Sequence, residues 1–194
     1  MSIRFRATLV VLSCLVSAGS HAQSLPTATR LSLDFSAGFT AVRANEGPGQ
    51  CGCFFMTGGS GELAVKNSHR TSLVLHFTRT SQNSINNTNQ NLILYNALEG
   101  ARYTLNQSGR WSPFAEALVG VSHTASNYEY YKSTNAPALL FGGGLDINLG
   151  HRISLRPVEG GWLFTTHRNA QNNFQNQLRL SGSIVFHLHR AAWE

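Results

Sequence analysis

The stretch QLRLSGSIVFHL, residues 177–188, alternates apolar and polar side chains along its whole length. One face carries Leu178, Leu180, Gly182, Ile184, Phe186 and Leu188, and the other carries Arg179, Ser181, Ser183, Val185 and His187. Because successive side chains of a β-strand point to opposite faces, this period of two predicts a strand with one apolar and one polar face.

The same alternation recurs elsewhere in the chain. Three further runs of comparable length show it, at residues 30–42, 71–80 and 138–149. Weaker strand candidates lie between the clear runs, at residues 59–66, 90–103, 113–123 and 153–165. Four clear runs are too many to arise by chance, so we predict an all-β protein with eight antiparallel strands closed into an up-and-down transmembrane barrel.

The segments between these strands alternate in length. Short ones lie at residues 66–69, 106–110 and 150–152, and longer, polar ones lie at residues 43–57, 81–89, 124–135 and 166–175. Short turns at one end and long loops at the other are typical of outer-membrane barrels, whose long loops are extracellular. We expect the loops at residues 43–57 and 124–135 to form the contact surfaces.

The composition separates a membrane barrel from a soluble one. Hydrophobic residues make up 42% of the 194 residues and charged residues only 12%, whereas a soluble domain has about a quarter charged. So few charges could not cover the outside of a soluble ligand-binding barrel, which is the main alternative. The same numbers exclude a disordered chain. A chain with thirteen arginines but only two lysines does not have the Lys-rich surface of a nucleic-acid binder.

The N-terminus has the pattern of a secretory signal peptide. Arg4 and Arg6 precede a largely apolar run at residues 7–19, and small residues stand three and one positions before a cut after Ala22. This core is too short to span a bilayer as a helix, so we expect residues 1–22 to be removed on export.

Two alternatives for the N-terminus are a retained membrane anchor and lipidation at Cys14. After the signal peptide we expect a linker at residues 23–29, the barrel at 30–188 and a tail at 189–194. No later segment has the 18 consecutive apolar residues of a transmembrane helix.

Charged residues on the predicted strands are expected inside the barrel. They are Glu116, Asp146, Arg156, Glu159 and Arg179, with Arg102 and Glu99 as further candidates of ambiguous facing. Because an isolated charge in a lumen filled by side chains costs several kcal/mol, these groups should form Arg–carboxylate pairs. Pro157 lacks an N–H and predicts a bulge that would turn Arg156 and Glu159 inward together. The network would either block the lumen or gate a narrow pore.

Cys51 and Cys53 lie in the first long loop. Exported cysteines usually oxidise, so we expect a local disulfide between Cys51 and Cys53. Because a Cys-x-Cys bridge is strained, free or intermolecular thiols and a metal site are alternatives. In the loop at residues 124–135, Tyr128, Tyr130 and Tyr131 would stack on sugars or partners, or lie at the lipid headgroups.

Catalytic motifs are missing from the sequence, so we expect no enzyme and no cofactor. Ser122-His123 is the only adjacent Ser–His pair, and on a strand these two side chains point to opposite faces. The glycines at 142–144 lie inside a predicted strand, which favours barrel curvature or close packing over a nucleotide-binding loop.

Several segments resemble the small outer-membrane β-barrels of the OmpA-like transmembrane-domain superfamily. They are residues 51–54, 58–61, 112–121, 141–146, 153–156 and 176–186. The resemblance implies an eight-stranded antiparallel barrel with inward arginines and acids, but it implies no single activity. Such barrels often end on an aromatic residue, whereas here residues 189–194 follow the final strand.

The sequence therefore predicts an integral outer-membrane barrel with a structural or surface-interaction role. A narrow pore and a soluble periplasmic barrel are the alternatives. The partners we expect are outer-membrane lipid, the barrel-assembly machinery during insertion, and an extracellular ligand or host surface. We expect a monomer and no nucleic acid.

Overall fold

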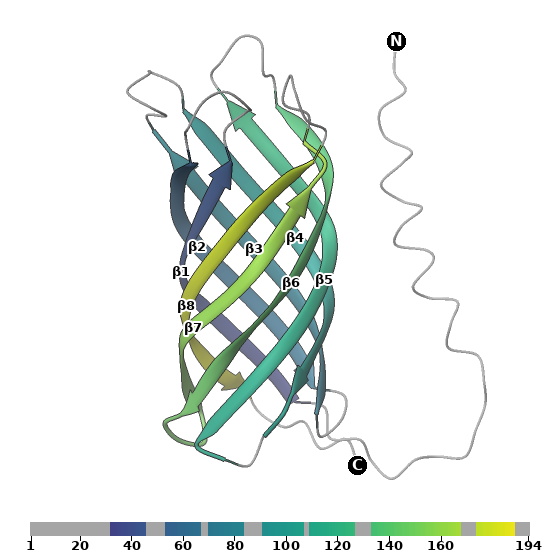
Figure 1. Ribbon diagram of the computed structural model, residues 1–194. Helices are drawn as coiled ribbons and strands as arrows, with labels where there is room; N and C mark the ends of the chain where they lie inside the picture. The colour runs from purple at the N-terminus through teal and green to yellow at the C-terminus, as the bar shows by residue number, and fades with distance from the viewer. Residues whose placement is uncertain are drawn as a thin grey trace, which may run out of the picture.

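The eight predicted strands form a closed barrel (Figure 1). The computed structural model describes residues 32–45, 53–66, 70–83, 91–106, 109–126, 133–167 and 174–188. The strands are β1 (Ser32–Asn45), β2 (Cys53–Lys66), β3 (Thr71–Gln82), β4 (Leu92–Thr104), β5 (Trp111–Ser126), β6 (Thr134–Asn148), β7 (Ile153–Thr165) and β8 (Gln175–Leu188). Each strand pairs antiparallel with the next, and β8 pairs with β1. The predicted fold class is confirmed. The described residues include no helix long and apolar enough to cross a membrane.

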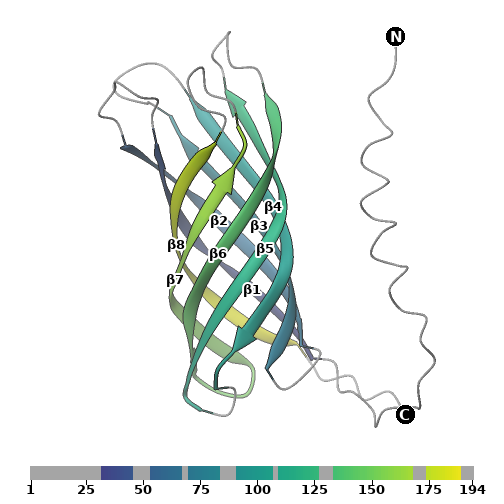
Figure 2. The same cartoon turned by 45° about the vertical axis from the view of Figure 1, so that its right-hand side comes forward.

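The pairing registers show how strongly the strands are staggered. Residues paired directly across neighbouring strands follow one path around the sheet, from Leu33 through Val65, Leu73, Ala101, Ala117, Phe141, Trp162 and Leu178 to Arg43. The path returns to β1 ten residues beyond its start, since 43 − 33 = 10. This stagger tilts the strands, as both views show (Figures 1 and 2), and an eight-stranded barrel of this kind has room only for side chains inside.

The outer face of the barrel is apolar and the inner face is largely polar. Large apolar side chains that are 37–60% exposed include Leu33, Phe39, Phe77, Val119, Phe141, Trp162 and Ile184. On the alternate positions of the terminal strands, Asp34, Thr40 and Arg179 are buried. A soluble barrel would bury its apolar face, so that alternative is wrong, and the apolar exterior is the surface that a bilayer covers.

Several strands run further than the alternation predicted. The segments at 43–57 and 124–135 were predicted as loops, but β1 runs to Asn45, β2 starts at Cys53, β5 runs to Ser126 and β6 starts at Thr134. The ladder continues because backbone groups pair whatever the side chain, whereas the alternation ends where both faces carry side chains of one kind, apolar at Phe54, Phe55 and Met56 and polar at Thr134 and Asn135.

The connections keep the predicted asymmetry. Those at residues 46–52, 83–91, 127–133 and 166–174 are longer than those at 67–70, 105–110 and 149–152. The short connections, the start of β1 and the end of β8 all lie at one end of the barrel (Figure 2). We call this the short-turn end and the opposite one the long-loop end.

Candidate functional site

Glu62 is the centre of a buried charge network inside the barrel. Its two carboxylate oxygens each accept a hydrogen bond of 2.5 Å from Arg102, and Arg156 Nη1 donates to it at 3.2 Å. All three side chains are at most 5% exposed. A single carboxylate therefore joins two guanidinium groups that are shielded from bulk solvent.

The remaining network residues extend this centre to four further strands. The ion pairs are Arg102–Glu116 at 2.6 Å, Arg156–Asp146 at 2.6 Å, Arg156–Glu159 at 2.8 Å and Arg179–Glu159. Arg179 also lies 3.0 Å from the Nε2 atom of His76. The structure thus brings together Glu116, Asp146, Arg156, Glu159, Arg179 and Arg102, each paired with an opposite charge as buried ions require.

A bulge at Pro157 sets the facing of two network residues. The β7–β8 register shifts between Arg156 and Glu159, and both of these side chains are buried. Strict alternation would have placed one of them on the lipid side, because they stand three positions apart. The bulge adds the one-residue slip that the proline in the sequence predicted.

Phe114 lies between the two central arginines. The guanidinium carbons of Arg102 and Arg156 are 4.3 Å and 4.5 Å from the centre of its ring. Gly144 stands opposite Phe114 in the register, and a Cβ added at Gly144 would lie 2.7 Å from the ring and 2.7 Å from the carbonyl oxygen of Val158. The mid-strand glycine therefore makes room for an aromatic ring that stabilises two buried cations.

Sequence reasoning missed Glu62 and His76 and left Glu99 undecided. Glu62 follows a glycine-rich stretch in the middle of β2 that shows no clear alternation, and His76 was assigned to a polar face without a role. Glu99 is exposed on the outer face of β4, opposite Leu75 and Val119, and no ion pair is found for it within the described residues. The network thus excludes Glu99.

An apolar layer lies inside the barrel beside the charge network. Its larger side chains are Val42, Met56, Leu94, Leu98, Leu118, Leu140 and Leu163, all at most 2% exposed. Val42, Met56 and Leu94 stand within three residues of strand ends at the long-loop end. By contrast, Arg102 and Arg156 stand within three residues of the short-turn end. The lumen is therefore filled by an apolar layer towards the long loops, interspersed with buried polar side chains such as Thr80, Asn96 and Ser122, and by an ionic layer towards the short turns.

The mouth at the short-turn end is polar. Asp34 pairs with Lys66 at 2.7 Å and with His187 at 2.8 Å, and a cavity of about 50 Å³ separates these groups from Glu62 and Arg156. Water therefore reaches the ionic layer from this end through a small polar cavity.

A buried Ser–His contact lies at the other mouth. Ser122 points inward and contacts His167, whose Nε2 is 3.0 Å from the serine Oγ, whereas His123 lies on the outer face. The other ring nitrogen of His167 is 3.2 Å from the hydroxyl of Thr134, and His167 forms no ion pair within the described residues. Burial, and secondarily the charge on His123, lower the pKa of His167. Ser122 is fully buried, and within the described residues the second ring nitrogen of His167 contacts a hydroxyl group and not a carboxylate.

The other predicted contacts lie mostly beyond what the structure describes. Cys51, Tyr128, Tyr130 and Tyr131 are outside the described residues. Cys53 was assigned to a loop, but it is the first residue of β2 and pairs in register with Asn45. Among the described residues, no group of three or more His, Cys, Asp or Glu could hold a metal ion.

Comparison with known proteins places the fold. No family model and no curated protein matches the sequence. Among solved structures, Neisserial surface protein A is similar with a TM-score of 0.66 and 11% identity, covering 80% of this chain and 97% of that one. The chain has the fold of the small outer-membrane β-barrels. Two other barrels of this kind are similar, Ail of Yersinia pestis (TM-score 0.57, 11% identity, 82% and 99% covered) and OprG of Pseudomonas aeruginosa (0.55, 9%, 83% and 97%).

At sequence identities of 9–11%, the similarity to these barrels shows the fold alone. The resemblance inferred from the sequence is confirmed at that level. Function in such barrels depends on the particular lumen, lipid face and loops, so it has to be argued from the residues of this chain.

Proposed function

We propose that the protein is an integral outer-membrane barrel with a closed lumen, which acts through its exterior and its long loops and neither conducts nor catalyses. The observation that carries this proposal is the filling of the lumen by two successive layers. An ion on its way through would have to separate buried pairs around Glu62 and then cross the apolar layer around Leu140. Each step is costly, because an unpaired charge in an apolar environment loses its solvation.

The orientation follows from the asymmetry of the connections. In barrels of this class the short turns face the periplasm and the long loops face outward. The ionic layer would then face the periplasm and the apolar layer the outside. The loops at residues 46–52 and 127–133, with the tyrosines predicted there, would present the contact surface for an extracellular ligand or host surface. Ail, one of the similar barrels, carries the name attachment invasion locus protein and has been solved in complex with the heparin analogue sucrose octasulfate.

A narrow pore is the second candidate, and the sharing of Glu62 favours it. Because this carboxylate binds both Arg102 and Arg156, an exchange of partners could open a path through the ionic layer without leaving a charge unpaired. The apolar layer would still close the lumen, which is why we favour the closed barrel.

Planar-bilayer recordings distinguish the two. We expect no conductance steps from the purified protein, and none from Arg156→Ala, because the apolar layer stays intact in that variant. A change of gel mobility on boiling should first show that each sample is a folded barrel. Steps in the wild-type protein, or steps gained by Arg156→Ala, would overturn the closed-lumen proposal in favour of the pore.

A further inference from the structure

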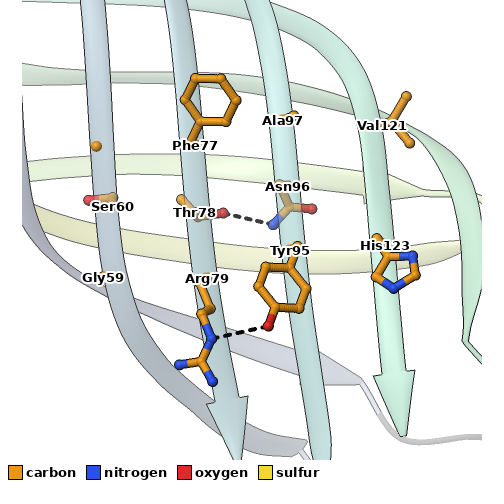
Figure 3. Close-up of a pocket in the computed structure, with 11 residues that line it drawn as sticks. Gly59, Ser60, Phe77, Thr78, Arg79, Tyr95, Asn96, Ala97, Val121 and His123 are labelled. Carbon is orange, nitrogen blue, oxygen red and sulfur yellow. Dashed lines mark hydrogen bonds between the residues drawn. The ribbon is translucent and has the colours of Figure 1, made fainter. Parts of the chain in front are cut away.

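The lipid-facing surface of β2–β5 contains a groove near the long-loop end. Its volume is about 580 Å³, within the range of small-molecule sites (Figure 3). The floor is formed by Gly59, Gly61 and Ala97, and the walls by Phe77 and Val121. A transmembrane barrel would have this hollow filled by lipid, so the question is whether the surroundings select one kind of lipid.

The missing side chains of two glycines create the floor. A Cβ added at Gly59 or Gly61 would have its nearest neighbour 3.8 Å away, so nothing in the barrel requires glycine there. At Gly58, by contrast, a Cβ would lie 1.9 Å from the carbonyl oxygen of Arg79. Glycine weakens a strand interior, and where packing does not demand it, it marks the close approach of another group.

Three polar side chains form the rim of the groove at the end nearest the long loops. Arg79, Tyr95 and His123 lie side by side on β3, β4 and β5 (Figure 3), within three residues of the strand ends that carry the long loops. Arg79 Nε donates to the hydroxyl of Tyr95 at 3.3 Å, and its guanidinium carbon is 5.8 Å from the centre of that ring. The rings of Tyr95 and His123 are 6.1 Å apart.

The rim holds an arginine that forms no ion pair with an acid of the described residues. The described residues include no carboxylate within ion-pair distance of Arg79, whereas the arginines inside the barrel are all paired with acids. Tyr95 holds the guanidinium at the boundary between the apolar surface and the long loops, where lipid headgroups lie. A guanidinium binds phosphate through two parallel N–H donors, so the rim is complementary to a phosphate above an acyl chain.

We propose that this groove binds one acyl chain of a phosphorylated glycolipid of the outer leaflet, of the lipid A type, with a lipid phosphate on Arg79. The apolar floor and walls take the chain, and the cationic rim selects the phosphate. This inference rests on the proposed membrane location but is independent of whether the lumen is closed. Docking of a second copy of the chain on the small-residue floor is the competing occupant.

Native mass spectrometry of the barrel in detergent, titrated with diphosphoryl lipid A, tests the proposal. The wild-type protein should retain one lipid. Arg79→Gln should weaken retention about tenfold or more, the loss expected for a charge-assisted hydrogen bond. Gly59→Val and Ala97→Leu, which fill the floor, should weaken it as well. Lipid A with its phosphates removed should bind the wild-type protein as weakly as the phosphorylated lipid binds Arg79→Gln.

Arg43→Gln is the matched control. Arg43 is also exposed near the long-loop end, but its register partners are Phe55 and Leu178, and it does not line the groove. It should retain lipid like the wild type. Equal retention by all variants would overturn the proposal, as would a dimer that Gly59→Val dissociates. A sample that fails the boiling shift would instead count against the proposed membrane barrel itself.

Discussion

Arg102 and Glu62 are joined by two parallel hydrogen bonds of 2.5 Å, although 40 residues separate them in the chain. Glu62→Ala should destabilise the barrel by about 3–5 kcal/mol, because Arg102 and Arg156 would both lose a shared buried anion. Denaturant unfolding in detergent micelles, followed by tryptophan fluorescence, measures the loss. Lys66→Gln is the control: Lys66 lies on β2 like Glu62, but it is partly exposed and pairs with Asp34 at the mouth of the barrel. Its loss should cost far less stability. Equal losses would show that Glu62 contributes little.

Gly144→Ala should destabilise the barrel by about 1–3 kcal/mol through overpacking. The added methyl would press on both the ring of Phe114 and the backbone of Val158, and the backbone contact leaves it no room to move aside. Gly59→Ala, whose methyl meets nothing closer than 3.8 Å, is the matched control. The same unfolding measurement applies, and a Gly144→Ala barrel as stable as the control would contradict the packing of Phe114 described above.

Replacing Glu99, the carboxylate on the lipid face, should raise the stability of the barrel, whereas replacing a carboxylate of the lumen should lower it. Glu99→Leu should stabilise the barrel in lipid by about 1–2 kcal/mol, because it removes a charge from the apolar exterior. Glu116→Leu, on the inner face, should destabilise the barrel, because it leaves Arg102 with one acid fewer. Unfolding in phosphatidylcholine vesicles compares the two variants. Destabilisation by Glu99→Leu would mean that Glu99 has a partner in the membrane.

His167 should respond to pH in a defined direction. Its pKa is lowered from 6.5, first by burial and then by the charge on His123, so the folded protein binds this proton less tightly than the unfolded chain does. The stability contribution of His167 is therefore full above pH about 6.5 and is lost as the pH falls below it. NMR titration of the imidazole should give a midpoint below 6.5. His123→Asn should move the midpoint upward but not to 6.5, since burial persists; a midpoint at or above 6.5 in the wild type would contradict the buried position.

The sequence was sufficient to predict the outer face of the barrel. Residues such as Phe39 and Leu180 alternate with polar or small neighbours, and a one-residue slip would have turned charges to the lipid. The inner apolar layer could not be read in this way, because Leu94, Leu98 and Leu118 belong to stretches that are apolar on both faces. Periodicity does not say which of two apolar faces points inward.

The charge network was only partly predictable for a related reason. Charges on clearly alternating strands, such as Asp146 and Arg179, could be placed by parity, and Pro157 signalled the bulge that turns Glu159. Arg102 and Glu99 are three residues apart on one strand, so only one of them could face inward without a bulge. Which one does so depends on Glu116 on the adjacent strand β5 and on Glu62 on β2, and those contacts are set by the register.

The pairing of β8 with β1 has a consequence for how the molecule is made. Leu33 lies beside Leu188, so the cylinder cannot close until nearly the entire polypeptide has been synthesised and exported. Before that moment both terminal strands have free edges that invite aggregation, and contacts between such distant segments form slowly. Chains truncated before residue 175 lack β8 and should therefore never close into a barrel.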